Sequence, residues 1–196
     1  MQARTGDAME DLSFSTLSSQ RLTVRRFRAD DAEPFAAYRS DPDVARYQGW
    51  EAPYSLANAA RLIESLQGAV PGAAGEGFQF AVTLTATGLL IGDCYLHPAC
   101  LDPGEAELGF TFAKAHQGRG YASEAVRCLL QYAFASLSLH RVFAVTYVQN
   151  KAARRLLERA GFRCEGPFNE KASRVESDNE LIYGLLQEDW RRRHAS

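Results

Sequence analysis

The sequence predicts a mixed α/β domain built on one sheet. Three features lead to this: a strand-like segment of alternating chemistry at Glu105–Phe112, a helical stripe after a glycine-rich turn, and a nearly continuous apolar segment at Arg141–Val148. Strand, crossover helix and second strand make a βαβ unit, which is right-handed in about 98% of cases. The apolar second strand is typical of a central strand covered on both faces.

The composition is that of a globular protein: 196 residues, 46% hydrophobic and 23% charged, with a formal net charge of −2. This charge predicts no nucleic-acid partner, because such binding depends on clustered Lys and Arg. The chain lacks a signal-peptide pattern and a long apolar run, so we expect a cytoplasmic protein without a membrane partner. No CxxC pair occurs among the four scattered cysteines, and no metal site is predicted.

The polar, Ser- and Thr-rich residues 1–20 predict a disordered leader, followed by one domain over residues 21–193. Order is expected to begin with a strand at Leu22–Phe27. Asp30 or Asp31 then caps a helix that runs to about Ser40. The following Asp41-Pro42-Asp43 ends this helix, because the residue before a proline disfavours the α region.

A second helix is predicted at Ser55–Gln67 from its apolar spacing. Two strands, Phe78–Thr85 and Leu89–His97, flank an Ala-Thr-Gly turn and predict a hairpin. In the strand Glu105–Phe112, alternate residues share a face. One face carries Glu105, Glu107, Gly109 and Thr111, and the other carries Ala106, Leu108, Phe110 and Phe112.

The remaining elements complete the sheet. A helical stripe continues from the glycine turn to about Ser136, and a further helix is predicted at Lys151–Ala160, ended by Gly161. The segments Arg163–Asn169 and Asn179–Leu186 are expected to form a closing strand pair.

The turn from His116 to Ala125 is the strongest functional signal. Gly118 and Gly120 permit conformations closed to other residues and let the backbone approach a ligand. The amides at the start of the next helix have no intrahelical partners, and with the helix dipole they form an anion site. Ser123 stands where a dinucleotide fingerprint requires Gly or Ala, and no phosphate-binding P-loop occurs. A bare Gly-x-Gly can also simply end a loop.

A second feature lies after the central strand, where Asn150 occupies the N-cap position of the next helix. Alone, this residue needs no role beyond capping. However, two helix N-termini after two parallel strands define one crevice at the strand ends, where α/β proteins bind ligands.

Both features resemble the GNAT acyl-CoA N-acyltransferases. Gln117-x-x-Gly120-x-Ala122 is similar to that family's Q/R-x-x-G-x-G/A motif, and Asn150 with Gly161-Phe162 is similar to its second CoA-contacting segment. Three segments resemble the RimJ/RimL branch more narrowly: the start Leu22-Thr-Val-Arg-Arg-Phe, the strand segment Glu107-Leu-Gly-Phe and the end Leu181–Trp190. The resemblance implies the GNAT fold: a central, mostly antiparallel sheet with a parallel, splayed strand pair and about four helices.

The resemblance also implies acetyl-CoA as co-substrate and a set of cofactor-binding residues. Main-chain amides of the turn would hold the diphosphate, the strand would pair with the pantetheine arm, and Asn150 would touch the pantetheine or the nucleophile. The turn contributes Gln117, Gly118, Arg119, Gly120, Tyr121, Ala122 and Ser123, and the strand contributes Phe110, Thr111 and Phe112.

Transfer to an amine needs a base, since a typical amine is protonated at neutral pH. Glu107 is the predicted catalytic base and Glu105 the next candidate, although two carboxylates on a strand face can also be merely solvated. Asp93 and His97 are weaker candidates. Leu157 and Ala153 stand where the family usually has residues that protonate the departing thiolate. Three interpretations remain: another residue (Tyr147 or Tyr121) donates the proton, the thiolate leaves without a dedicated acid, or the activity has been lost.

The segment 41–55 carries Tyr47, Trp50 and Tyr54, which either wall an acceptor site or plug the core. The predicted function is an N-acetyltransferase that moves the acetyl group of acetyl-CoA to a primary amine in a ternary complex. The acceptor is either a protein N-terminus, such as that of a ribosomal protein, or a small amine, and the sequence does not decide between them. It also leaves open whether the protein forms a homodimer. The alternatives are a non-catalytic acyl-CoA sensor on the same fold and, more remotely, a nucleotide-dependent enzyme.

Overall fold

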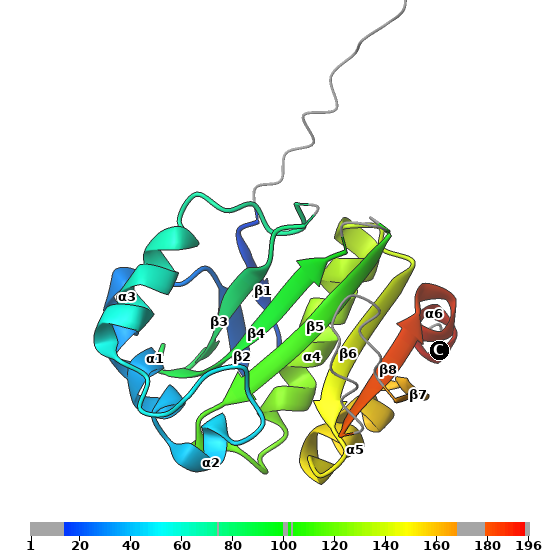
Figure 1. The fold of residues 1–196 in the computed structure, drawn as a ribbon. Helices are drawn as coiled ribbons and strands as arrows, with labels where there is room; N and C mark the ends of the chain where they lie inside the picture. Colours follow the sequence, from blue (N-terminus) through cyan, green and yellow to red (C-terminus); the bar gives the residue numbers. More distant parts are fainter. Residues whose placement is uncertain (1–13, 74, 100–101, 103, 168–178, 195–196) are drawn as a thin grey trace, which may run out of the picture.

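The computed structural model describes residues 14–73, 75–99, 102, 104–167 and 179–194. An eight-stranded sheet runs through the molecule in the order β1-β2-β3-β4-β5-β6-β8-β7 (Figure 1). The strands are β1 Thr16–Ser18, β2 Leu22–Arg25, β3 Phe78–Leu84, β4 Leu90–Pro98, β5 Glu105–Phe112, β6 Arg141–Tyr147, β7 Arg163–Pro167 and β8 Glu180–Leu186.

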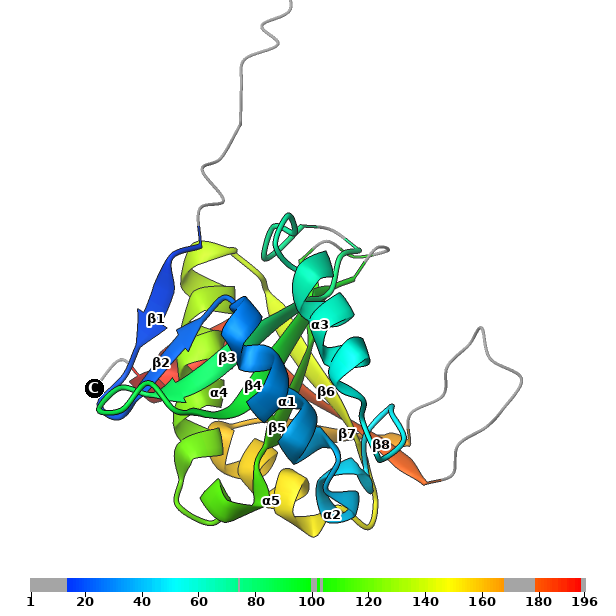
Figure 2. The same ribbon diagram turned by 90° about the vertical axis from the view of Figure 1, so that its left-hand side faces the viewer.

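Helices cover both faces of this sheet. The helices are α1 Ala32–Arg39, α2 Pro42–Ala45, α3 Leu56–Ser65, α4 Tyr121–Gln131, α5 Lys151–Ala160 and α6 Gln187–His194. Seen together, Figures 1 and 2 place α1 and α3 over one face and α4 and α5 over the other. None of the described helices has the length and apolar character needed to span a membrane.

The predicted mixed sheet is confirmed, and its pairs are antiparallel except for β5 and β6. The parallel register extends only from Glu105↔Arg141 to Glu107↔Phe143. Beyond this point β6 stays paired with β8 as far as Tyr147↔Glu180, while β5 continues alone against β4 as far as Phe112. The two strands therefore diverge, and beyond Glu107 one edge of β5 has no strand partner among the described residues.

Three expectations about the elements need correction. Residues 14–20 are ordered, because Phe14 is buried against Phe80 and Tyr132 and Thr16–Ser18 pairs with β2. The rest of the expected leader, residues 1–13, lies outside the described residues.

The proline of Asp41-Pro42-Asp43 starts a helix as well as ending one. Pro42 is the first residue of α2, where its missing N–H costs nothing, and the Asp41 carboxylate accepts from the Asp43 amide at 2.9 Å. With α2 and the C-terminal α6, the chain has more helices than the four expected. The four residues of α2 are too few for a periodic apolar stripe, and α6 is almost entirely polar.

Candidate active site

The glycine turn adopts the geometry that its residues allow. Gly118 and Gly120 have φ of +73° and +81°, and Gly120 is the N-cap residue of α4. In the described part of the chain, no protein acceptor receives a hydrogen bond from the main-chain amides of residues 118–123. The positive end of α4 lies behind them, so the turn presents unsatisfied donors where an anion would be stabilised.

The turn is fixed to the strand before it. The Gln117 side chain donates from Nε2 to the Phe112 carbonyl at 2.8 Å. Lys114, just before the turn, forms an ion pair with Asp43 of α2. These contacts hold the end of β5, the turn and α2 around one opening.

That opening is a cavity of about 610 Å³. Among the predicted cofactor residues, it is lined by Phe110, Thr111, Phe112, Gln117, Gly118, Gly120, Tyr121, Ala122, Ser123 and Asn150. Arg119 is not among the lining residues, and its carbonyl accepts from Arg21 in the turn between β1 and β2. The structure thus brings two segments some thirty residues apart in sequence to one cavity.

The α5 side of the cavity contains residues that the sequence analysis missed. Asn150 caps α5 as the simple interpretation required, since its Oδ1 accepts from the Ala153 amide at 3.1 Å. Further along α5, Arg155 and Arg159 also line the cavity, and both are exposed. The sequence could have predicted these two residues, because their i, i+4 spacing puts both arginines on one side of α5. That side faces away from the buried Leu156 and Leu157.

The unpaired edge of β5 faces this cavity. Main-chain groups alternate between the two edges of a strand, and the Ala113 amide donates to Ile91 of β4 at 2.9 Å. Thr111 therefore faces β4, whereas Phe110 and Phe112 direct their main-chain groups to the side that β6 has left. The Phe112 carbonyl is taken by Gln117, so the Phe112 amide and both main-chain groups of Phe110 lie next to the gap.

Glu107 lies where the two strands separate. It is the last residue of β5 in register with β6, where it lies opposite Phe143. On the other side of β5 it lies opposite His97 of β4. Its half-buried side chain is on the α1 face of the sheet and does not line the cavity. Burial and the charge of Glu107 together raise the pKa of Tyr95 from its ordinary value, which keeps a protonated phenol beside this carboxylate.

The other acidic candidates have structural partners. Glu105 accepts from Arg141 at 2.6 Å, and Arg141 also bridges to Glu165. Asp93 is 1% exposed and accepts from Tyr38, Arg39 and Gln79, so it anchors α1 to the sheet.

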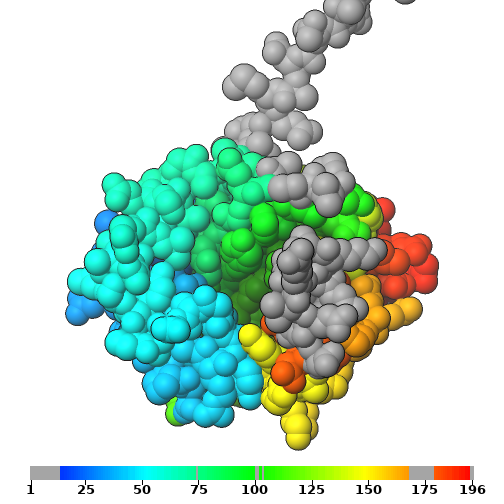
Figure 3. All heavy atoms as spheres, viewed as in Figure 1, coloured from blue at the N-terminus to red at the C-terminus, as the bar shows by residue number. Residues whose placement is uncertain are grey.

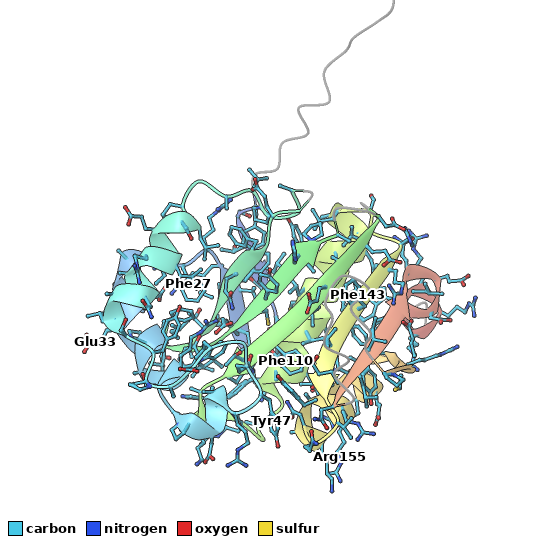
Figure 4. The ribbon with its side chains drawn as sticks, viewed as in Figure 1. Phe27, Glu33, Tyr47, Phe110, Phe143 and Arg155 are labelled. Carbon is cyan, nitrogen blue, oxygen red and sulfur yellow. The ribbon has the colours of Figure 1, made fainter. Side chains whose placement is uncertain are left out.

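The aromatic residues of segment 41–55 were expected either to wall the acceptor site or to fill the core, and the structure shows both kinds of position. Trp50 packs over the Arg39 guanidinium at 3.9 Å and donates to the Arg39 carbonyl, so it covers a buried arginine, and Tyr54 packs against Phe35 at the edge of the core. Tyr47 lines the cavity instead, near Phe110 and Arg155 (Figure 4). In the space-filling view the face over β5 is hollowed between this segment and the residues that follow β6 (Figure 3).

His116, which the sequence suggests is a loop or edge residue rather than a catalyst, also lines the cavity. Its Nδ1 is buried and, among the described residues, has no hydrogen-bond partner. Burial and the charge of Arg119 lower the pKa of this imidazole, which favours its neutral form.

No proton donor stands at the two positions on α5 that the family resemblance identified. Leu157 is 1% exposed and packs in the core, whereas Ala153 is 8% exposed and lines the cavity with a methyl group that cannot donate a proton. Tyr121 lines the cavity at the turn, and Tyr147 ends β6 with its ring beside Tyr47.

Comparison with known proteins identifies the family. Residues 21–163 match the acetyltransferase (GNAT) domain. The uncharacterized N-acetyltransferase p20 of Bacillus licheniformis is 32% identical over 153 residues, which cover 78% of this chain and 85% of that protein. A shorter match, 35% identical over 104 residues (53% of this chain, 57% of the relative), is to Bacillus subtilis YdaF, provisionally named a ribosomal N-acetyltransferase.

Solved structures share the fold. A GNAT-family acetyltransferase from Bacillus anthracis superimposes with a TM-score of 0.75 at 28% identity, over 88% of this chain and 99% of that one. RimJ of Mycobacterium smegmatis, in complex with CoA-disulfide, has a TM-score of 0.72 at 20% identity over 89% and 88% of the two chains. This chain therefore belongs to the GNAT acetyltransferases, and it is an N-acetyltransferase with acetyl-CoA as its co-substrate.

Proposed function

We propose that the protein transfers the acetyl group of acetyl-CoA directly to a primary amine while both substrates are bound. One observation supports this above all: unsatisfied amides at the start of α4 and the unpaired edge of β5 meet in the same cavity. The first can hold a diphosphate and the second an extended pantetheine arm. A thioester would then lie near the point where β5 and β6 separate.

In this proposal the cofactor-binding residues are those predicted from the sequence, joined by Arg155 and Arg159. The amides of the turn bind the diphosphate, and the two arginines add positive charge on the α5 side. The Phe110 amide, on the free edge of β5, donates to the thioester oxygen. Negative charge develops on that oxygen during attack, so such a donor lowers the barrier by about 3 kcal/mol.

Glu107 is the proposed base. The amine nitrogen attacks the carbonyl carbon, a C–N bond forms, and the C–S bond breaks. The amine proton passes to the Glu107 carboxylate, directly or through a water molecule. The thiolate of CoA departs without a dedicated acid and takes its proton from solvent, because a thiol of pKa about 8.5 is a good leaving group.

The acceptor is a primary amine that reaches the hollow over β5. The provisional name of YdaF supports a ribosomal-protein N-terminus as one class, and small amines such as polyamines form the other. A panel of peptides with free N-termini and of small amines, incubated with acetyl-CoA, tests the proposal through the appearance of free thiol. Release that depends on an amine supports transfer. CoA binding without release for any amine would favour a sensor instead.

A further inference from the structure

We propose that Arg21 is a positioning residue for cofactor binding, and that it acts by fixing the peptide bond between Arg119 and Gly120. This inference rests on the proposed binding of the diphosphate by residues 118–123. Arg21 lies in the short turn between β1 and β2, almost a hundred residues away in sequence, and does not line the cavity.

The contacts of Arg21 place its guanidinium under the turn. Its Nη1 donates to the Arg119 carbonyl at 3.1 Å. Its Nη2 lies against Gly120, where an added Cβ would be 3.4 Å away. The guanidinium carbon is 4.5 Å from the centre of the Tyr121 ring. One side chain therefore touches three consecutive residues of the turn from the side away from the cavity.

Peptide geometry turns this contact into a constraint on the ligand site. In a planar trans peptide the carbonyl and the amide N–H point in opposite directions. Holding the Arg119 carbonyl toward Arg21 directs the Gly120 N–H the other way, and Gly120 does line the cavity. The neighbouring glycines let this peptide rotate at little energetic cost. The hydrogen bond from Arg21 therefore determines the direction of the Gly120 N–H.

Glu124 keeps Arg21 in this position. Its carboxylate, on the first turn of α4, accepts from the Arg21 amide at 2.8 Å, from Arg21 Nε at 2.7 Å and from Ser19 Oγ at 2.7 Å. The Glu124 side chain is only 9% exposed. Burial alone would raise its pKa, but the bonds from Ser19 and Arg21 outweigh this and lower it. The carboxylate therefore stays charged and ties the β1–β2 turn to α4.

The test measures CoA binding and turnover in Arg21→Gln, Arg21→Lys and the control Arg61→Gln, an exposed arginine of α3. We expect the Kd for CoA to rise about tenfold in Arg21→Gln, as for one lost hydrogen bond to a charged group. Arg21→Lys should bind almost as weakly, because an ammonium cannot reach both Glu124 and the Arg119 carbonyl in the fork geometry of Arg. Arg61→Gln should match the wild type.

A truncated donor, the acetyl thioester of N-acetylcysteamine, separates positioning from general damage. It lacks the diphosphate, so its second-order rate constant, taken from initial slopes, should be the same in wild type and Arg21→Gln. Equal losses with both donors, or full CoA affinity in Arg21→Lys, would overturn the inference. If the wild type itself fails to bind CoA, the proposed function fails. If the wild type binds CoA and Arg21→Gln binds it equally well, only the role of Arg21 is refuted.

Discussion

The ring centroids of Tyr47 and Tyr147 lie 5.9 Å apart with their planes inclined at 38°. Tyr47 comes from the segment after α2 and Tyr147 from the end of β6, so this contact joins the aromatic segment to the strand that leaves β5. Tyr47 also lines the cavity. The pair therefore bounds the cleft on the side where β5 and β6 have separated.

Tyr147→Phe tests whether this phenol protonates the departing thiolate. The ring contact with Tyr47 survives the change while the hydroxyl is lost. Because CoA thiolate needs no dedicated acid in our mechanism, we expect kcat within about threefold of wild type. Tyr147→Ala, which removes the ring as well, should raise the KM for acetyl-CoA or for the amine. A loss of about 100-fold in kcat for Tyr147→Phe would instead identify it as the general acid.

Glu107→Gln tests the base. The substitution keeps shape but not proton affinity, so kcat should fall by about 100-fold or more while the Kd for CoA changes little. Glu105→Gln is the matched control, on the same strand face but held by Arg141. It should keep its kcat and lose less than about 1 kcal/mol of stability, as for a partly exposed ion pair. Equal kcat values for the two variants would remove Glu107 from the mechanism.

Gly118→Ala and Gly88→Ala form a matched pair for the turn. Their φ values are +73° and +72°, and an added Cβ meets nothing within 4 Å at either site. Each substitution should lower the free energy of unfolding by about 1 kcal/mol, the cost of a left-handed conformation for Ala. Only Gly118→Ala should also weaken CoA binding, because Gly88 lies in the β3–β4 hairpin. Chemical denaturation and calorimetric titration measure the two effects, and weaker CoA binding by Gly88→Ala would contradict this account.

His116 predicts a pH dependence of stability. Its pKa in the folded protein is below the ordinary value of 6.5. At acid pH the imidazole therefore binds a proton more tightly in the unfolded chain than in the folded protein, which favours unfolding. The contribution to stability is complete above pH 6.5 and is lost as the pH falls from there toward the folded pKa. The free energy of unfolding should therefore fall less between about pH 7.5 and about pH 5.5 in His116→Gln than in wild type. Parallel pH profiles would show that the imidazole does not contribute.

Local chemistry explains what could be predicted from the sequence. Gly118 and Gly120 need no distant partner to take a positive φ, and the alternation along Glu105–Phe112 reports directly on its two faces. The cavity could be expected because both of its helix N-termini follow strands of one βαβ unit. These features depend on residues close together in the chain.

Long-range contacts explain what was missed. The order at Phe14 comes from rings on β3 and after α4, and nothing near it in sequence signals this. Trp50 and Tyr47 come from one segment, yet only the three-dimensional position of Arg39 shows that Trp50 packs on this buried arginine and not in the cavity. The link from Arg21 to the glycine turn likewise joins segments almost a hundred residues apart in sequence.

The most direct measurement of the central claim is the amide ¹H–¹⁵N spectrum of the protein titrated with CoA, with ADP and with pantetheine. The account predicts that CoA and ADP, which both carry a diphosphate, shift the amide signals of residues 118–123. Pantetheine should leave those signals in place and instead shift amides along Leu108–Phe112. If CoA binds and the signals of residues 118–123 do not move, the diphosphate is held elsewhere and the account is wrong.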